Sequence, residues 1–399
     1  MISIVHKPLE QDTRGILPLL DRAHAQRARR FHLSLQDYAP TPLQPLDQLA
    51  CHLGISKLWV KDESGRFGLK AFKALGGSYA IARTLMDRLQ EPEEYMTVDY
   101  LRSEAVRRRL GDLTFITTTD GNHGASIAWT ARLLDYPAVV YMPRGTAPER
   151  VHRIENLGAQ VIVTDMGYDD TVRLSFAEAE RNGWLAAQDT TAPGYEQFPF
   201  YCMQGYTTMA LEALEALEAT GQKPTHVFVQ AGAGTLTGAI TAFFAQAYPD
   251  NPPLLAVIEA ESYNALQRTA EAADGHNRTA PGSNDTIMAG LSVGEMCTVA
   301  WDALRCSATC YAAVDNPTAA TGMRVLGAPL LGDPRVISGE SGAVGVGLLY
   351  AALADPEQTE LRKKLKLNRN SRVLCFSTEG DTDPQGYRRV VWEGAFPLK

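Results

Sequence analysis

Two lysines, Lys70 and Lys73, are the residues of this chain that most directly suggest chemistry. They lie within residues 63–77, where glycines precede an alanine-rich, apolar sequence. If both lysines lie on one helix, their spacing of three residues places them on the same face. A lysine that is removed from water loses its proton more easily, and a neutral amine can attack a carbonyl cofactor. The alternative is that both are solvated charges at the edge of a helix.

A second candidate is the glycine-rich stretch at residues 229–238, which follows an expected strand and opens an expected helix. Backbone N–H groups in such a turn can hold a phosphate, and Thr235 and Thr237 add hydroxyl donors. The stretch can also be interpreted as a dinucleotide-binding turn, with Glu259 as the acid that would meet a ribose. The glycine spacing is one residue too long for that motif. A third interpretation is that the glycines only allow close helix–strand packing.

Two further polar turns follow expected strands. Residues 117–124 read Thr-Thr-Thr-Asp-Gly-Asn-His-Gly, and their N–H and hydroxyl groups suit a carboxylate. Within them Asn122 can donate to a phenolic oxygen and Asp120 is an available carboxylate, unless an Asp or Asn here simply caps the next helix. Residues 376–383 lie at the carboxyl end of the last expected strand, where α/β proteins place ligands; the alternative is an ordinary turn rich in Thr, Gly and Asp.

Strands alternate with helices along most of the chain. We expect a polar helical region up to about residue 39, strands at residues 58–60, 113–116, 138–142, 160–164, 225–230, 254–259 and 371–377, and helices at residues 78–89, 124–134, 149–157, 171–182 and 236–247. This alternation predicts parallel sheets covered on both faces by helices. Residues 91–110 lack strand signals and are expected to be an insertion or a helical excursion.

Length and charge exclude several classes of protein. The 399 residues favour two lobes, and the net charge of −8 gives no general attraction to nucleic acid or to an anionic membrane. The N-terminal residues lack the apolar core of a signal peptide, and the longest apolar tract, residues 342–354, is too short to span a bilayer. We expect a cytoplasmic protein without nucleic-acid or membrane partners, whose lobes are interleaved because no linker is marked by composition.

The six cysteines are scattered, and only Cys306 and Cys310 lie close together. No histidine cluster accompanies that pair, so no metal site is expected. Free, buried thiols in a reducing compartment are the simplest interpretation.

Taken together, the polar stretches resemble the fold-type II pyridoxal-phosphate enzymes, the superfamily of tryptophan synthase β-chain and threonine dehydratase. Within that superfamily the sequence is most similar to the diaminopropionate ammonia-lyases. The resemblance covers residues from about 31 to the last residue and is carried by K-D-E-S-G-R-F-G-L-K-A-F-K-A-L-G-G, T-T-T-D-G-N-H-G, V-T-D-M-G-Y-D-D-T-V-R, I-S-G-E-S-G-A-V-G and S-T-E-G-D-T-D-P.

The resemblance implies a particular architecture. It implies an α/β fold of two lobes, each a mostly parallel twisted sheet flanked by helices. Residues 1–85 and 208–399 would form a large cofactor-binding domain, and residues 86–207 a small substrate-gating domain. The resemblance also implies a homodimer.

The resemblance further implies the residues that bind the cofactor, pyridoxal 5′-phosphate. Lys73 would form the Schiff base, which leaves Lys70 a surface or supporting residue. The remaining cofactor contacts would be Asn122 to the pyridoxal O3′, Gly232, Ala233, Gly234, Thr235 and Leu236 to the phosphate, Ser377 to the pyridine nitrogen, and Thr378 and Glu340 near the ring. A hydroxyl facing the pyridine nitrogen leaves it largely unprotonated, which favours prompt elimination.

The implied catalytic residues are Lys73, Asp120 and Asp189, and the implied substrate contacts are Thr118, Thr119, Asp120, His123 and Asp189. Serine and threonine dehydratases usually carry serine in the place of Asp120. A carboxylate there would repel a substrate carboxylate unless it also met a cation, and the second ammonium of diaminopropionate is such a cation. By sequence alone, Asp189 is equally well explained as a turn residue at a strand end.

The implied reaction is the α,β-elimination of D- and L-2,3-diaminopropionate to pyruvate and two molecules of ammonia. Lys73 would remove the α-proton of one enantiomer and Asp120 that of the other, from the opposite face. The alternatives are a serine or threonine dehydratase of the same fold, a non-catalytic ligand-binding protein with this fold, and an NAD-dependent dehydrogenase built on the glycine-rich loop. The last gives no role to the A-F-K and G-N-H-G stretches.

Overall fold

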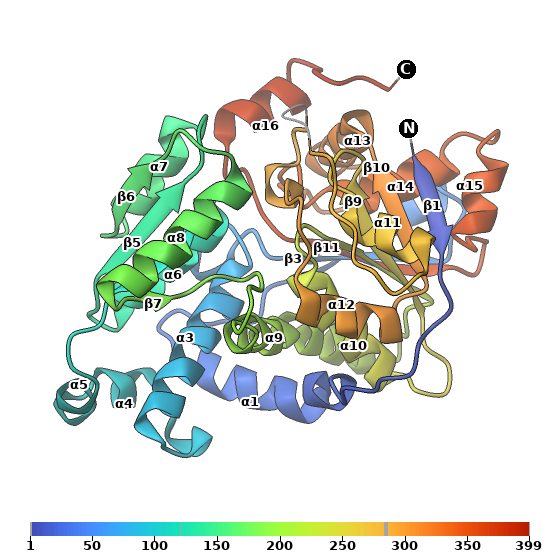
Figure 1. Cartoon of the computed structure of the whole chain (residues 1–399). Coiled ribbons are helices and arrows are strands. Elements are labelled where there is room, and N and C mark those ends of the chain that lie inside the picture. Colours follow the sequence, from blue (N-terminus) through green and yellow to red (C-terminus); the bar gives the residue numbers. More distant parts are fainter. Residues whose placement is uncertain (1, 120, 283–285, 399) are drawn as a thin grey trace.

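Two sheets organise the chain (Figure 1). Residues 2–119, 121–282 and 286–398 are described by the structure, a computed structural model. The larger sheet has seven strands in the order β1-β10-β9-β8-β11-β3-β2, and the smaller has four in the order β6-β5-β4-β7. The expected fold class, two lobes built on mostly parallel sheets, is confirmed.

The larger sheet is parallel in its centre and antiparallel at its two edges. Its central strands are buried on both faces, which explains why they are continuous apolar runs rather than alternating patterns. Its strands are β1 (Ser3–His6), β2 (Leu43–Pro45), β3 (Lys57–Asp62), β8 (His226–Gln230), β9 (Leu254–Ala260), β10 (Cys310–Val314) and β11 (Arg372–Ser377).

Helices cover both faces of the larger sheet, each layer with its own apolar core. One layer contains α1 (Arg22–His32), α3 (Lys73–Leu89), α9 (Gln197–Ala219), α10 (Thr235–Ala247) and α12 (Thr298–Ser307). The other contains α2 (Asp47–His52), α13 (Asn316–Gly327), α14 (Val344–Leu353) and α16 (Pro384–Val391). Helix α11 (Ala265–Ala272) lies against β1 and β10, and α15 (Thr359–Lys364) against α14.

The smaller sheet is parallel throughout and lies beside the larger one (Figure 1, green). Its strands are β4 (Phe115–Thr118), β5 (Ala138–Met142), β6 (Gln160–Val163) and β7 (Leu185–Ala186), and its helices are α6 (Asn122–Leu133), α7 (Pro148–Glu155) and α8 (Tyr168–Asn182). Two short helices, α4 (Val98–Arg102) and α5 (Glu104–Leu110), occupy the charged stretch after α3. These strands fall inside residues 86–207; the domain boundaries themselves stay a prediction.

Helices α3 and α9 approach closely because each has a glycine at the contact. A Cβ added at Gly205 would lie 2.4 Å from the carbonyl oxygen of Leu75, and one added at Gly76 would lie 2.3 Å from the ring of Tyr206. No side chain fits at such distances, so glycine is required at both positions. The contact holds the first turn of α3, which begins at Lys73.

The expectation that Lys70 and Lys73 share a helix face is wrong. Gly68 and Lys70 have left-handed backbone angles, with φ of 69° and 55°. Because a right-handed helix cannot include such residues, α3 starts only at Lys73 and Lys70 lies in the preceding turn. Lys70 is about half exposed, and its Nζ donates to Oδ1 of Asp381 at 2.7 Å.

The expected helical region up to residue 39 is only partly correct, because residues 3–6 form β1 and the α-helix spans Arg22–His32. The other expected strands and helices are present, with ends shifted by a few residues. Four strands were not predicted from sequence: β1, β2, β7 and β10. The first three are short, and the apolar run of β10 (Cys-Tyr-Ala-Ala-Val) is interrupted by two alanines, which have weak strand preference.

Within the part of the chain that the structure describes, no helix is both long and apolar enough to cross a bilayer. No group of His, Cys, Asp and Glu side chains in that part has the arrangement of a metal site. The six cysteines are free thiols, and all but Cys51 are buried.

Candidate active site

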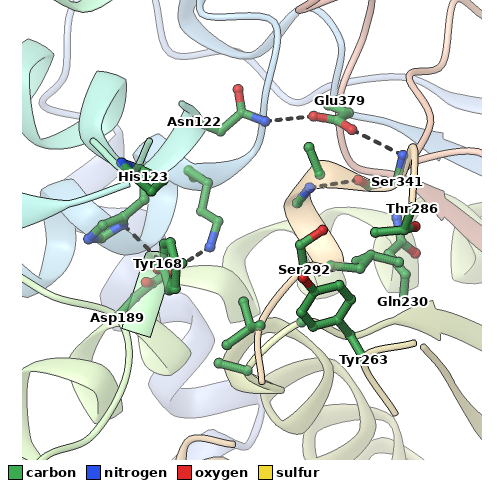
Figure 2. Close-up of a pocket in the computed structure, with 18 of the residues that line it drawn as sticks. Asn122, His123, Tyr168, Asp189, Gln230, Tyr263, Thr286, Ser292, Ser341 and Glu379 are labelled. Atoms are coloured by element: carbon green, nitrogen blue, oxygen red, sulfur yellow. Dashed lines mark hydrogen bonds and ion pairs between the residues drawn. The ribbon is translucent and has the colours of Figure 1, made fainter. Parts of the chain in front are cut away.

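A cavity of about 540 Å³ is enclosed by segments that follow the carboxyl ends of strands in both sheets (Figure 2). The larger sheet contributes the turns after β8, β9 and β11, and the smaller sheet those after β5, β6 and β7. The first residues of α3 and α6 complete the wall. Ligand sites of parallel α/β sheets lie at these strand ends.

Lys73 and Asp189 meet on the wall of this cavity. Lys73 Nζ donates to Oδ2 of Asp189, which lies shortly after β7. Burial alone would raise the pKa of Asp189, but the neighbouring His123 and Lys73 outweigh it and lower that pKa to about 2. The carboxylate is therefore ionised throughout the ordinary pH range.

His123 lies on the other side of the same carboxylate (Figure 2). Its Nε2 is 2.7 Å from the carbonyl oxygen of Ala187, so Nε2 carries the hydrogen. Its Nδ1 lies 3.6 Å from Oδ2 of Asp189 and has no hydrogen-bond partner among the described residues. Burial lowers the pKa of His123, although the carboxylate of Asp189 opposes that shift. Nδ1 is thus a buried nitrogen beside Asp189.

A buried cluster of charges fixes the loop that leads to Lys73. Arg66 donates to Oε2 of Glu63 at 2.8 Å and to Oε2 of Glu212 at 2.7 Å, and Lys61 donates to Glu212 as well. All four side chains are at most 1% exposed. Burial alone would lower the pKa of Arg66, but the two carboxylates hold it above its ordinary value. The cluster joins β3, the loop and α9 into one rigid support.

The glycine-rich stretch forms a second wall of the cavity. Residues 232–237 line it, and α10 begins within the stretch at Thr235. Gly234, the residue before the helix, has φ of 96°, which glycine adopts without strain. The first backbone N–H groups of a helix have no acceptor within the helix, so this turn directs donors at the cavity. Thr235 Oγ1 is used elsewhere, donating to the carbonyl oxygen of Asp189 at 2.7 Å.

Asn122 is held at both ends of its amide. Its Nδ2 donates to Oε2 of Glu379 at 2.6 Å, and Arg153 donates to its Oδ1 at 2.9 Å. The helix-cap explanation of Asn122 is wrong, because α6 begins at Asn122 and its N-cap residue is Gly121. Asn122 therefore lines the cavity as the first helical residue, with its side chain turned toward the larger lobe (Figure 2).

The two hydroxyl residues at the carboxyl end of β11, Ser377 and Thr378, differ in their surroundings. Ser377 is fully buried, and its Oγ lies 2.8 Å from Oγ of Ser338. Thr378 lines the cavity, and its Oγ1 accepts a hydrogen bond of 2.7 Å from Nε2 of Gln230. Of these two hydroxyls, only that of Thr378 faces the cavity.

Glu340 lies behind the cavity wall rather than on it. Burial and the neighbouring carboxylate of Glu379 raise its pKa to about 8, while Arg150 donates to its Oε1 at 3.2 Å. Thr118 and Thr119 also lie outside the wall. The hydroxyl of Thr118 donates to the carbonyl oxygen of Thr171 at 3.2 Å, and that of Thr119 accepts from the backbone of Gly121 at 2.8 Å. The implied ligand roles of these residues stay predictions.

Asp120, the implied second base, lies outside the described residues. Its role stays a prediction from sequence.

Several wall residues were not assigned a role from sequence. Residues 143–147, Tyr168 and Tyr263 follow the carboxyl ends of β5, β6 and β9, a position that could have marked them. Residues 286–293, which contain a short 3-10 helix at Ala289–Leu291, have no such signal. The hydroxyl of Tyr168 accepts from Nε2 of Gln188 at 3.2 Å.

The dinucleotide interpretation of the glycine-rich loop is wrong. Glu259, the acid that would bind a ribose, is fully buried. Its two carboxylate oxygens accept the backbone N–H groups of Leu266 and Gln267 at 2.9 and 2.7 Å. Glu259 therefore caps α11 from inside the core and is not available to a ligand.

Comparisons with known proteins relate this chain to pyridoxal-phosphate dependent enzymes. Residues 35–379 match the family described as pyridoxal-phosphate dependent enzymes. The chain is 46% identical over 378 residues to diaminopropionate ammonia-lyase of Escherichia coli (strain K12), which covers 94% of this chain and 93% of that protein. The crystal structure of the holo form of the Escherichia coli enzyme superposes with a TM-score of 0.92 at 43% identity, over 100% of this chain and 98% of the other. L-threonine ammonia-lyase of Geobacter sulfurreducens is 28% identical over 134 residues, 34% of this chain and 31% of that protein.

Proposed function

The chain belongs to the family of pyridoxal-phosphate dependent enzymes, and from this we propose that it eliminates ammonia from 2,3-diaminopropionate. In the overall reaction the Cβ–N bond breaks and Cα loses its proton. Water then replaces the remaining amine, so that one diaminopropionate and one water yield one pyruvate and two ammonia. The observation that carries the proposal is the Lys73–Asp189 pair, which faces a phosphate-binding turn across one cavity.

The residues present fit pyridoxal phosphate. The turn at residues 232–236 offers backbone donors and a helix N-terminus to a phosphate, and Lys73 lies in the same cavity. The hydroxyl of Thr378 accepts from Gln230 and so keeps its own hydrogen for an acceptor such as a pyridine nitrogen. Ser377, which the resemblance implied for that nitrogen, stays a prediction.

When bound, the cofactor supplies an electron sink that makes the α-proton of an attached amino acid acidic. The residues of this chain must then move protons. Lys73 removes the α-proton of one enantiomer, and Asp120 removes that of the other; Asp189, kept ionised by His123 and Lys73, attracts the second ammonium of the substrate.

The serine or threonine dehydratase alternative is less well supported. Threonine dehydratases match at lower identity: that of Mycobacterium bovis is 26% identical over 88% of this chain, against 46% over 94% for diaminopropionate ammonia-lyase. A hydroxyl substrate also brings no cation to the ionised Asp189, whereas diaminopropionate does. The dehydrogenase alternative has lost its ribose-binding acid, because Glu259 is used within the core.

The stoichiometry of the products tests the proposal. We expect the purified protein, incubated with pyridoxal phosphate and diaminopropionate, to release two ammonia for each pyruvate, and to act far more slowly on L-serine and L-threonine. One ammonia per 2-oxoacid, with serine or threonine as the faster substrate, would support a dehydratase instead.

Borohydride reduction identifies the lysine that binds the cofactor. We expect the reduced cofactor on the peptide that contains Lys73, with the label lost in Lys73→Ala and kept in Lys70→Ala. Lys70 is the matched control, because it is three residues away and pairs with Asp381 at the surface. A label on Lys70, or no label at all, would contradict the proposed site.

Two further expectations belong with this proposal. A cytoplasmic location is expected from the sequence and a homodimeric assembly is implied by the resemblance, and both stay predictions. Size-exclusion chromatography with light scattering measures the second directly.

A further inference from the structure

The amide of Asn122 is oriented by two charged side chains of opposite type. Arg153, on α7, donates to Oδ1 at 2.9 Å, and Glu379, after β11, accepts from Nδ2 at 2.6 Å. A guanidinium can only donate and a carboxylate can only accept. The two partners therefore determine which end of the amide is oxygen and which is nitrogen, so the amide cannot be flipped without losing both bonds.

Each of these partners is itself held in place. Glu379 is 4% exposed, and its Oε1 accepts the backbone N–H of Ser341 at 3.2 Å. Arg153 also donates to the carbonyl oxygen of Leu69, in the segment that leads to Lys73. Burial lowers the pKa of Arg153. Placing a partly buried guanidinium against two neutral oxygens costs free energy, because neither oxygen compensates its charge.

Among the described residues, only one of the two amide hydrogens of Asn122 has an acceptor, which leaves the other for a ligand. An amide nitrogen carries two hydrogens, and Glu379 accepts one of them. Asn122 lines the cavity, so the second is available there. The positive charge of Arg153 on Oδ1 polarises the amide, and a polarised N–H is a stronger donor to an ionised oxygen.

We propose that Arg153 is a positioning residue that orients and polarises Asn122, so that Asn122 donates to the ionised ring oxygen of the bound cofactor. This inference rests on the proposed assignment of Asn122 to pyridoxal O3′. Arg153 does not touch the cofactor itself; it acts through the amide. Without Arg153, the Asn122 amide would be a weaker donor, and the ionised form of the ring oxygen would be less stable.

The test compares Arg153→Met and Arg153→Lys with Arg132→Met. Arg132 is a suitable control because it belongs to the same lobe and donates to a backbone carbonyl, that of Asn156, at the surface. Cofactor affinity is measured by equilibrium dialysis, and the ionisation of the bound cofactor by its visible absorbance as a function of pH. For Arg153→Met we expect about tenfold weaker binding and a visible band that develops at higher pH, because a lost charge-assisted hydrogen bond destabilises the ionised form. Arg153→Lys should be intermediate and Arg132→Met unchanged.

A double-mutant cycle separates this role from a merely structural one. If Arg153 acts through Asn122, Arg153→Met should have almost no further effect on the spectrum in an Asn122→Ala background. A full effect in that background, or a wild-type spectrum in Arg153→Met, would overturn the inference. If Arg153→Met does not fold, as judged by circular dichroism, the same cycle is run with Arg153→Lys.

Failure of this inference is distinguishable from failure of the proposed function. If Asn122→Ala leaves cofactor affinity and spectrum unchanged, the inference is wrong, while the release of two ammonia per pyruvate by the wild-type protein still stands. A wild-type protein that does not bind the cofactor contradicts both.

Discussion

Lys73 and Asp189 form an ion pair that joins the two lobes across the cavity. Lys73 begins α3 of the larger lobe, and Asp189 follows β7 of the smaller sheet. Thr235, at the start of α10 in the larger lobe, donates to the backbone carbonyl oxygen of Asp189 at 2.7 Å. The position of the Lys73 amine therefore depends on both lobes together.

Replacing Asp189 by Asn should reduce kcat by about 10²-fold or more while the cofactor stays attached to Lys73. An amide cannot hold the Lys73 ammonium or attract the second ammonium of the substrate by charge, and the loss of one such electrostatic contact in an active site costs about 10²–10³-fold. Asp381→Asn, which removes the partner of the exposed Lys70, is the control and should keep full activity. Because the pKa of Asp189 is about 2, the acid limb of the pH–rate profile should persist in the Asn variant. A wild-type rate in Asp189→Asn would contradict this role.

Replacing Asp120 by Asn should abolish the reaction with D-diaminopropionate and spare much of that with the L enantiomer. The reason is that Lys73 approaches the substrate from one face only, so the other face needs a second base. Pyruvate formation from each pure enantiomer measures the effect. Equal loss of both activities would contradict the two-base assignment.

Replacing Glu212 by Gln should lower the free energy of unfolding by about 3–5 kcal/mol, because it leaves the buried cations Lys61 and Arg66 without one of their counter-charges. Glu215→Gln, one turn further along α9, removes a partly exposed pair with Arg29 and should change that free energy by less than about 1 kcal/mol. Urea unfolding followed by circular dichroism gives both values. Similar effects of the two substitutions would mean that the buried cluster adds little to stability.

Glu259→Gln should change the dependence of stability on pH. Burial raises the pKa of Glu259 from 4.5 to about 8, so between these values the folded protein binds the proton more tightly than the unfolded chain does. This group therefore makes the wild type less stable as the pH rises from about 4.5 to 8. Glutamine does not ionise, so the stability of Glu259→Gln relative to wild type should increase over that range. A pH-independent difference between the two unfolding free energies would contradict the raised pKa.

Much of the fold can be predicted from the local pattern of apolar and polar residues. Buried parallel strands are continuous apolar runs, and the turns after them gather at one edge of each sheet, which is why the stretches around Lys73, Asn122 and Gly234 could be expected to meet. The match to diaminopropionate ammonia-lyase over 94% of the chain confirms the family resemblance stated from the motifs. Pattern alone could not choose between Lys70 and Lys73. The left-handed backbone of Lys70, which turns it to the surface, has no sequence signal.

The contacts that join distant segments could not be predicted from sequence. Glu379 lies 257 residues from Asn122, and Arg153 lies 31 residues from it in another helix. A single sequence does not show which distant segments contact one another. A buried Arg or Glu therefore cannot be distinguished from a surface charge before the three-dimensional structure is known. The free Nδ1 of His123 was hidden for the same reason.

The pairing of β3 with β11 has a consequence for the order in which the protein is made. Lys57–Asp62 pairs residue by residue with Arg372–Ser377, after the smaller lobe and most of the larger one have been synthesised. A growing chain that has not reached residue 372 has the lysine loop but lacks the strand beside it. Such long-range pairing forms slowly and leaves strand edges exposed in the meantime. Lys73 should therefore become able to capture the cofactor only late in biosynthesis, when that last strand of the larger sheet has been made.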